Sequence, residues 1–197
     1  RRANSADDVE LYQAYINAAE MYGLPLSVRI GRQEMTFGGG FLVGTNPSAD
    51  PFTGLSFDAI RLTYATEQFS VDAWTSKLAE NGSAEQDGDV DFYGVYASYK
   101  GFQDIELDAF WMLVRDARRI SDTNLFWPGE RIENAFDLDD YDVTNLNAVG
   151  VRFAGTWNAF DWETQVVYEF GNADAVGSLF TLGDYGDNRS RWDAWGG

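Results

Sequence analysis

The chain has 197 residues, a net charge of −18, no cysteine and no histidine. The absence of thiol and imidazole groups excludes disulfides, thiolate metal sites and histidine-based catalysis or zinc binding. A nucleic-acid partner is not expected of so acidic a chain.

Eight segments alternate apolar and polar residues, as strands with one apolar face do, and a ninth begins near residue 189. The eight are 9–22, 25–36, 57–66, 69–79, 90–100, 104–115, 144–157 and 160–171. For example, Ile105, Leu107 and Trp111 share one face, whereas Glu106 and Asp108 share the other. Such runs suit tilted membrane strands of about 9–11 residues, and no apolar run approaches the length of a membrane helix.

The connections between these segments alternate in length. The short ones are 23–25, 67–68, 101–103 and 157–159, and the long ones are roughly 37–55, 80–89, 117–142 and 172–187. Short periplasmic turns alternating with long extracellular loops are typical of barrels in the bacterial outer membrane. The sequence therefore predicts an all-β, antiparallel transmembrane β-barrel surrounded by outer-membrane lipid, with the four short turns on one edge. Because the last residues lack a terminal aromatic strand, we expect residues 1–197 to be a single barrel domain incomplete at both ends.

The alternation assigns each side chain to a face of the barrel wall. The residues predicted to face outward to lipid include Leu26, Val28, Ile30, Ile105, Leu107, Trp111, Val149 and Val166. The residues predicted to face inward include Arg29, Gln33, Arg61, Asp72, Glu106, Asp108, Asn147, Arg152 and Glu163. Charges at membrane depth require water or an ionic partner, so we expect a wet or ion-paired lumen.

Three features concern the long loops. The glycines 38–40 lack the Lys-Ser/Thr pair of a phosphate-binding loop, which predicts a flexible loop tip. The loop 117–142 could fold inward as a constriction or project outward to dock a partner protein. Acidic clusters at 85–91, 137–142 and 184–188 could bind Ca²⁺ or carry solvated charge, and no other cofactor is expected.

Residues 29–44 read RIGRQEMTFGGGFLVG. This string resembles the hallmark of the alginate export family of outer-membrane porins, in which a similar R-x-G-R-Q-E and aromatic-Gly pattern precedes an extracellular loop. The likeness continues through 57–64, 69–74 and 91–96. The resemblance implies a monomeric barrel of roughly eighteen strands, about half of which this chain would supply. It also implies passive passage of a solute, which in the founding members is an anionic polysaccharide moving through an arginine-rich pore.

Carried over by position, the resemblance implies that Arg29, Arg32, Arg61 and Arg152 contact the anionic solute. The residues Gln33, Asp72, Asp108 and Glu163 complete the pore-lining set that we predict. The alternative from the residues themselves is that the inward arginines pair with acids of the barrel wall, for example Arg61 with Asp72.

The expected function is passive diffusion of a small or polymeric hydrophilic solute, an anionic carbohydrate, through a charged lumen. Two alternatives stay open: a non-conducting scaffold or sheath for a partner protein, and a secreted carbohydrate-binding β-sandwich. The uniform hairpins favour a barrel over the sandwich. No enzyme is predicted, because Asp161 and Glu163 share one face, whereas glycoside hydrolysis needs carboxyl groups across a cleft.

Overall fold

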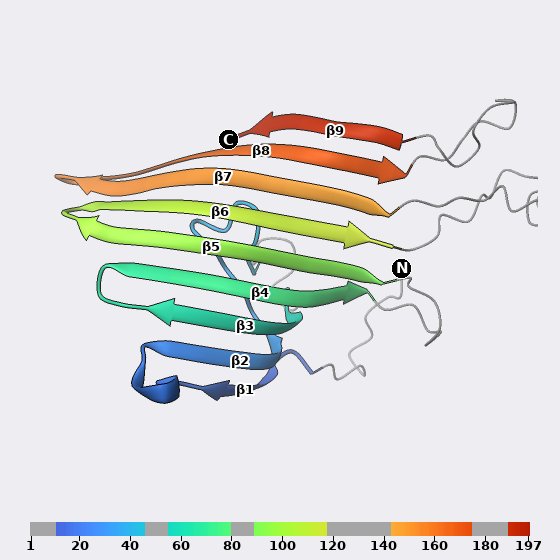
Figure 1. Ribbon diagram of the computed structural model, residues 1–197. Coiled ribbons are helices and arrows are strands. Elements are labelled where there is room, and N and C mark those ends of the chain that lie inside the picture. The colour runs from blue at the N-terminus through green and yellow to red at the C-terminus, as the bar shows by residue number, and fades with distance from the viewer. Residues whose placement is uncertain (1–10, 46–54, 80–88, 118–142, 175–188) are drawn as a thin grey trace, which may run out of the picture.

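The computed structural model describes residues 11–45, 55–79, 89–117, 143–174 and 189–197. These residues form nine strands in one antiparallel sheet, and each strand pairs with its neighbours in the chain (Figure 1). The elements are β1 Ala14–Ala18, the short 3-10 helix η1 Met21–Gly23, β2 Leu26–Gln33, β3 Phe57–Ala65, β4 Phe69–Ala79, β5 Val90–Phe102, β6 Ile105–Asp116, β7 Thr144–Trp157, β8 Phe160–Asp174 and β9 Arg189–Gly196. In these ranges no helix is long and apolar enough to cross a membrane.

The four short connections lie together at one edge of the sheet, on the left in Figure 1, as the sequence predicted. In the β5–β6 and β7–β8 turns a non-glycine residue adopts the left-handed region, with φ of 58° at Asp104 and 56° at Asn158. Asp and Asn tolerate this conformation because their short polar side chains can form local hydrogen bonds. The all-β antiparallel fold is therefore confirmed, and among the described residues the sheet is open.

The first strand is shorter than the predicted range 9–22. Pairing ends at Ala18, because Glu20 and Tyr22 adopt positive φ of 52° and 58° and the chain turns through η1. The predicted strand extends through these residues, but a left-handed backbone cannot continue a strand. Residues 9 and 10 lie outside the described part of the chain.

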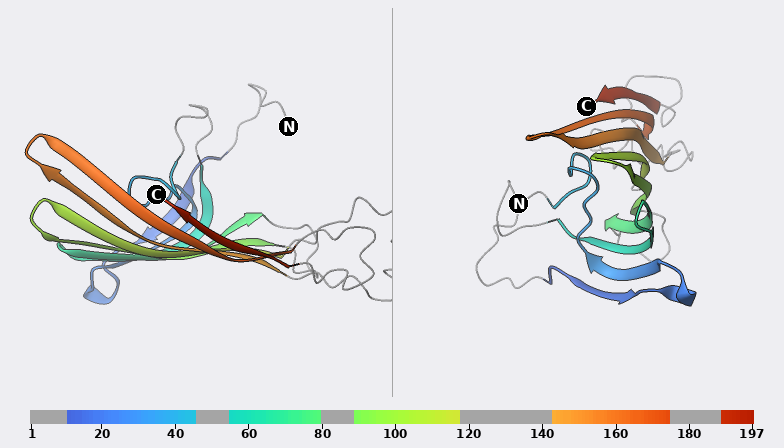
Figure 2. Two further views of the ribbon diagram at one scale, coloured as in Figure 1. Left: turned by 90° about the horizontal axis from the view of Figure 1, so that it is seen from above. Right: turned by 90° about the vertical axis from the view of Figure 1, so that its left-hand side faces the viewer.

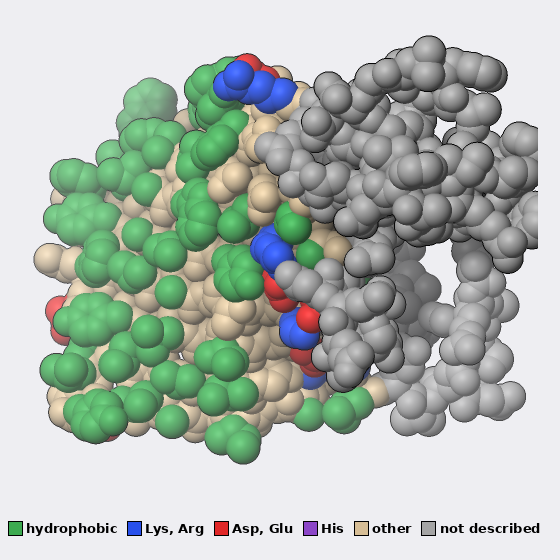
Figure 3. All heavy atoms as spheres, turned by 45° about the vertical axis from the view of Figure 1, so that its right-hand side comes forward, with side chains coloured by type: hydrophobic (Ala, Val, Ile, Leu, Met, Phe, Trp, Pro, Cys, Tyr) green, Lys and Arg blue, Asp and Glu red, His purple; other side chains and the backbone are tan. Residues whose placement is uncertain are grey.

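The sheet is curved, and its two faces differ in chemistry (Figure 2). The convex face carries the apolar residues predicted to point outward, among which Ile30, Ile60 and Val166 are about half exposed. The concave face carries the inward set, including Asp72, Asp108 and Arg152, which are buried. Figure 3 shows hydrophobic side chains over the outer surface and charged ones gathered toward the long-loop end.

Two residues predicted to face inward lie on the convex face. Arg32 neighbours Gln33 in β2, so the two side chains point to opposite faces, and Arg32 pairs with Asp58 at 2.6 Å. Asn147 lies an odd number of positions before Arg152 in β7, so the two side chains point to opposite faces, and Asn147 Oδ1 accepts a hydrogen bond from Trp111 Nε1 at 3.1 Å. Both inward predictions are wrong for the same reason, since a strand alternates its faces with period two.

A row of polar residues crosses the convex face near the long-loop edge. Register places one residue of each strand from β2 to β8 directly opposite the next. In order, these outer-row residues are Arg32, Asp58, Lys77, Asp91, Arg115, Asn145 and Asn172. Opposite charges thus face each other across four successive strand pairs, which is the favourable cross-strand arrangement.

Candidate functional site

Residues 34–45, here called the inner segment, leave the end of β2 and lie on the concave side of the sheet (Figure 2). The segment closes on itself, because Phe37 N donates to Val43 O at 3.1 Å and Gly40 N donates to Phe37 O at 3.0 Å. At its base the Tyr12 hydroxyl donates to the Glu34 carboxylate, and this hydrogen bond raises the pKa of Tyr12. The segment buries Met35 completely and Phe37 and Val43 almost completely.

Gly38 and Gly39 lie close to charged side chains of the concave face, so they do not project away from the sheet, and the flexibility predicted for them stays a prediction. A methyl group added at Gly38 would lie 2.7 Å from both the Tyr96 hydroxyl and the Arg152 side chain. A methyl group at Gly39 would overlap the Glu163 carboxylate. Gly38 and Gly39 therefore permit a close approach of the backbone to the charged groups of the concave face.

Phe37 inserts its ring into a stack of aromatic side chains contributed by β4 and β5. Its centroid lies 4.4 Å from that of Trp74 and 5.1 Å from that of Tyr96, with interplanar angles of 17° and 23°. Tyr96 in turn stacks on Phe110 of β6 at 5.7 Å. Offset stacking of this kind adds about 0.5–1.5 kcal/mol per pair beyond area burial. The stack is the anchor of the inner segment.

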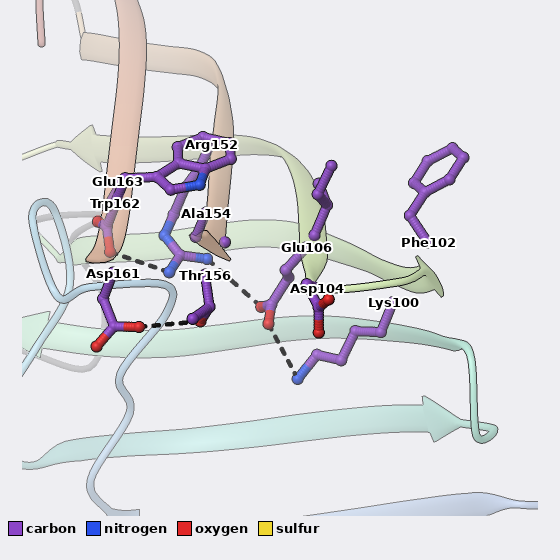
Figure 4. Close-up of a pocket in the computed structure, with 12 residues that line it drawn as sticks. Lys100, Phe102, Asp104, Glu106, Arg152, Ala154, Thr156, Asp161, Trp162 and Glu163 are labelled. Carbon is purple, nitrogen blue, oxygen red and sulfur yellow. Dashed lines mark hydrogen bonds and ion pairs between the residues drawn. The ribbon is translucent and has the colours of Figure 1, made fainter. Parts of the chain in front are cut away.

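Beneath the glycines, Arg152 of β7 binds carboxylates from two neighbouring strands (Figure 4). Its Nη1 donates to Asp108 Oδ2 at 2.6 Å and lies 3.4 Å from Glu106 Oε1, and its Nη2 donates to Glu163 Oε2 at 3.0 Å. Tyr96 also donates its hydroxyl proton to Asp108 Oδ2, at 2.6 Å. Because Asp108 is fully buried, these two donors are what compensate its lost hydration.

The other inward arginines are also engaged. Arg61 Nε donates to Asp72 Oδ1 at 2.8 Å, and the Thr63 hydroxyl donates to the same oxygen. The guanidinium of Arg29 lies over the Tyr15 ring, 4.5 Å from its centroid. The structure thus contains the Arg61–Asp72 wall pair that the sequence offered as the alternative to a free arginine ladder.

Gln33 has no exposed surface and ties two strands together. Its Nε2 donates to the carbonyl oxygens of Ala59 at 3.1 Å and of Arg29 and Gly31 at 3.3 Å. The predicted site therefore divides into several parts. Asp108, Arg152 and Glu163 form one cluster, Arg61 and Asp72 form a pair, and Arg32 lies on the other face.

Polar atoms beneath and around the inner segment are incompletely paired. Six buried side-chain atoms make no hydrogen bond within the described residues: Arg29 Nε, Gln33 Oε1, Trp74 Nε1, Ser76 Oγ, Asp108 Oδ1 and Arg152 Nε. All six belong to the concave face. An unsatisfied buried polar atom costs about 1–3 kcal/mol, so this packing is less favourable than its aromatic contacts alone suggest.

A cleft of about 570 Å³ opens on the concave face toward the short-turn edge. Its charged groups include Lys100, which lies 3.3 Å from Glu106, and Asp161, which accepts a hydrogen bond from Thr156 at 2.9 Å. Figure 4 shows these side chains turned toward the space beside Arg152 and Glu163. Both ion pairs and the Thr156 hydroxyl therefore border the cleft.

Toward the long-loop edge the concave face is apolar, which the sequence did not predict. A second cleft of about 370 Å³ lies between the inner segment and the sheet. Its lining includes Leu42, Val43, Phe57, Met112 and Leu146. The inner surface thus changes from charged to apolar along the strands.

No group of carboxylates in the described ranges could hold a metal ion. The acidic clusters at 85–91, 137–142 and 184–188 lie wholly or mostly outside those ranges, as does the loop 118–142. The predictions made for them concern residues beyond the described structure.

Among curated proteins and solved structures, none matches the chain. The family model described as "Alginate export" matches residues 1–197. That match covers every strand of the curved antiparallel sheet, together with the inner segment and the charged cleft. The chain therefore belongs to the alginate export family.

Proposed function

We propose that the chain forms part of the wall of an outer-membrane conduit, through which a hydrophilic, carbohydrate-type solute passes by passive diffusion. The observation that carries the proposal is the contrast between the two faces of the sheet. Apolar side chains on the convex face suit lipid, whereas ion pairs and the Thr156 hydroxyl border the 570 Å³ cleft on the concave face. The family is described by export rather than by catalysis, and we propose no enzymatic role.

The inner arginines do not form a free ladder of positive charge. Arg61 is paired with Asp72, and Arg152 is shared among three carboxylates. Glu169 and Asp161 add further acids to the concave face of β8. We therefore propose that an anionic polysaccharide, where it is the solute, is recognised through its hydroxyl groups rather than by net charge, and that anion selectivity is weak.

Conductance and ion selectivity of the full-length protein in planar bilayers test this proposal. The expected result is a conducting pore with a small preference between K⁺ and Cl⁻ and a current that hydrophilic oligosaccharides reduce. A strong anion preference would instead support the arginine ladder. The absence of any current would contradict passive diffusion.

The inner segment favours a second candidate, a plugged barrel that serves as a scaffold. Its Met35 and Phe37 side chains are buried against the concave face, where a solute would have to pass. Replacing residues 35–43 by a short Gly-Ser linker separates the two functions. A conduit should gain conductance when the segment is removed, whereas a scaffold that is closed by other parts of the protein should still conduct no current.

A further inference from the structure

Phe37 stacks on two aromatic side chains, Trp74 and Tyr96, here called the walls of the site, and the Arg61 guanidinium lies over its ring. We propose that Phe37 occupies a stacking site for a pyranose ring, formed by Trp74, Tyr96 and the Arg61–Asp72 pair. The inner segment then competes with carbohydrate for this site. The inference rests on the proposed carbohydrate solute and adds to it a defined subsite and its internal competitor.

The two walls match the faces of a sugar ring. The Trp74 and Tyr96 rings stack on Phe37 at 4.4 and 5.1 Å with interplanar angles of 17° and 23°. Removing the Phe37 side chain would therefore expose both rings and leave a ring-sized space against them, here called the slot. The faces of a pyranose present C–H groups, which pack favourably on the negative face of an aromatic ring. Its hydroxyl groups point outward from the ring edge, toward whatever surrounds the slot.

The surroundings of the slot are polar, which suits a sugar better than it suits phenylalanine. The Arg61 guanidinium carbon lies 5.1 Å from the Phe37 centroid, and its carboxylate partner Asp72 is adjacent. Trp74 Nε1 and Ser76 Oγ are buried on the same strand and make no hydrogen bond within the described residues. A phenyl ring offers these groups no partner, whereas sugar hydroxyl groups can both donate and accept.

The walls are fixed by the sheet and do not depend on the inner segment. Trp74 lies opposite Gly94 in the register of β4 and β5, and a methyl group at Gly94 would overlap the indole ring. The indole therefore covers Gly94 of β5. The Tyr96 hydroxyl is held by Asp108, which Arg152 holds in turn. The slot should keep its shape after Phe37 leaves.

The inner segment is built so that it can be exchanged. Among the described residues, the backbone hydrogen bonds of its residues 34–43 stay within the segment, and none joins it to the strands below. The glycines 38–40 contribute no side chains to the contact. The attachment therefore depends mainly on Met35, Phe37 and Val43, and a ligand that replaces the Phe37 contact removes its aromatic anchor.

Binding measurements on the full-length protein in detergent test the inference, with maltohexaose and a mannuronate hexamer as the two probes. Phe37→Ala should bind at least one probe about tenfold more tightly than the unmodified protein, by isothermal titration calorimetry. Met35→Ala is the matched control, since it also loosens the segment but leaves the Phe37 ring in the slot, and its affinity should rise much less. The double variant Phe37→Ala/Trp74→Leu should lose this gain in affinity, because it lacks one of the two aromatic rings.

The inference is overturned if Phe37→Ala and Met35→Ala gain affinity equally, if neither gains, or if the Trp74 substitution leaves the gain intact. Where Phe37→Ala fails to fold, Phe37→Leu carries the same comparison with a smaller expected gain, since it keeps apolar volume but removes the ring. Bilayer conductance of the same variants separates this inference from the proposed function. Binding without current would contradict the conduit alone, whereas current without binding would contradict the stacking site alone.

Discussion

Asp108 shows how a single buried charge depends on its neighbours. It has no exposed surface, and Arg152 and Tyr96 each donate to its Oδ2 at 2.6 Å. Removing one partner of such a pair leaves the other charge buried without compensation, which costs more than the pair contributes. The stability of this cluster is therefore a sensitive measure of whether the concave face is built as described.

Arg152→Gln should lower the free energy of unfolding by about 3–5 kcal/mol, and adding Asp108→Asn should recover most of that loss. Urea unfolding of the full-length protein in lipid vesicles measures both values. Arg32→Gln is the control, because its partner Asp58 is 53% exposed and such pairs contribute at most about 1 kcal/mol. An equal loss in the two single variants would mean that Arg152 is not in a buried network.

Arg61→Gln should destabilise the protein because it leaves Asp72, which is 8% exposed, without its guanidinium partner. Arg61→Gln/Asp72→Asn should restore stability, and the K⁺/Cl⁻ preference should change little across the two variants. Thermal unfolding together with bilayer reversal potentials checks the prediction. A large drop in anion preference with unchanged stability would instead support the hypothesis that the inward arginines form an anion-binding ladder.

The faces of individual side chains could be predicted from period two alone. Asp72, Asp108, Arg152 and Glu163 lie where the alternation placed them. The resemblance to the family implies that Arg32 lines the pore together with Gln33. Two adjacent strand residues cannot share a face, so the alternation alone excludes one of them. The ion-pair partners depend on cross-strand register, which the turn positions constrain only within a few residues.

At the scale of elements, the strands were predictable and the inner segment was not. The alternation in 57–66 and 69–79 specifies strands almost to the residue, and β3 and β4 span Phe57–Ala65 and Phe69–Ala79. A signal for the segment did exist, because Trp74, Tyr96 and Phe110 place large rings on the face reserved for water. Neighbouring aromatic rings on an inward face indicate an element that covers them, but nothing in the sequence says which one.

Gly94→Ala tests the fit between β4 and β5, since the added methyl group would overlap the Trp74 indole and displace it from Phe37. Overpacking of this kind should lower the free energy of unfolding by about 1–3 kcal/mol. Gly196→Ala is the control, because an added methyl group there meets nothing within 4 Å. Urea unfolding compares the two, and equal stability would show that the indole can move aside freely.

At the scale of the whole molecule, the two faces of the sheet specify opposite environments. The fold could be predicted because a wall between lipid and water imposes one apolar face on every strand. The packing on the concave side could not be predicted, because it depends on contacts between β2, β4, β5 and β7 that no local pattern encodes. The apolar cleft beside Leu42 and Val43 is the clearest case.

Single cysteines test the orientation of the wall, and the chain contains no cysteine of its own. Glu106→Cys should react with a membrane-impermeant maleimide from the aqueous phase, because this position borders the cleft. Leu107→Cys, its neighbour on the convex face, should be protected in lipid vesicles and become reactive on unfolding. Asn147→Cys should also be protected. Reaction at 107 with protection at 106 would invert the assignment of the wall.

The outer-row residues fix how deeply the proposed conduit sits in its bilayer. Toward the short turns the convex face carries mostly apolar side chains, and at the row it changes to Arg32, Asp58, Lys77, Asp91 and Arg115. Sinking the sheet would carry cations into hydrocarbon, at about 2–4 kcal/mol each at the midplane. Raising it would expose apolar surface to water, at about 25 cal/mol per Å². These opposing penalties act as a restoring force on vertical position, so the protein should favour bilayers whose hydrocarbon thickness matches the span below the row.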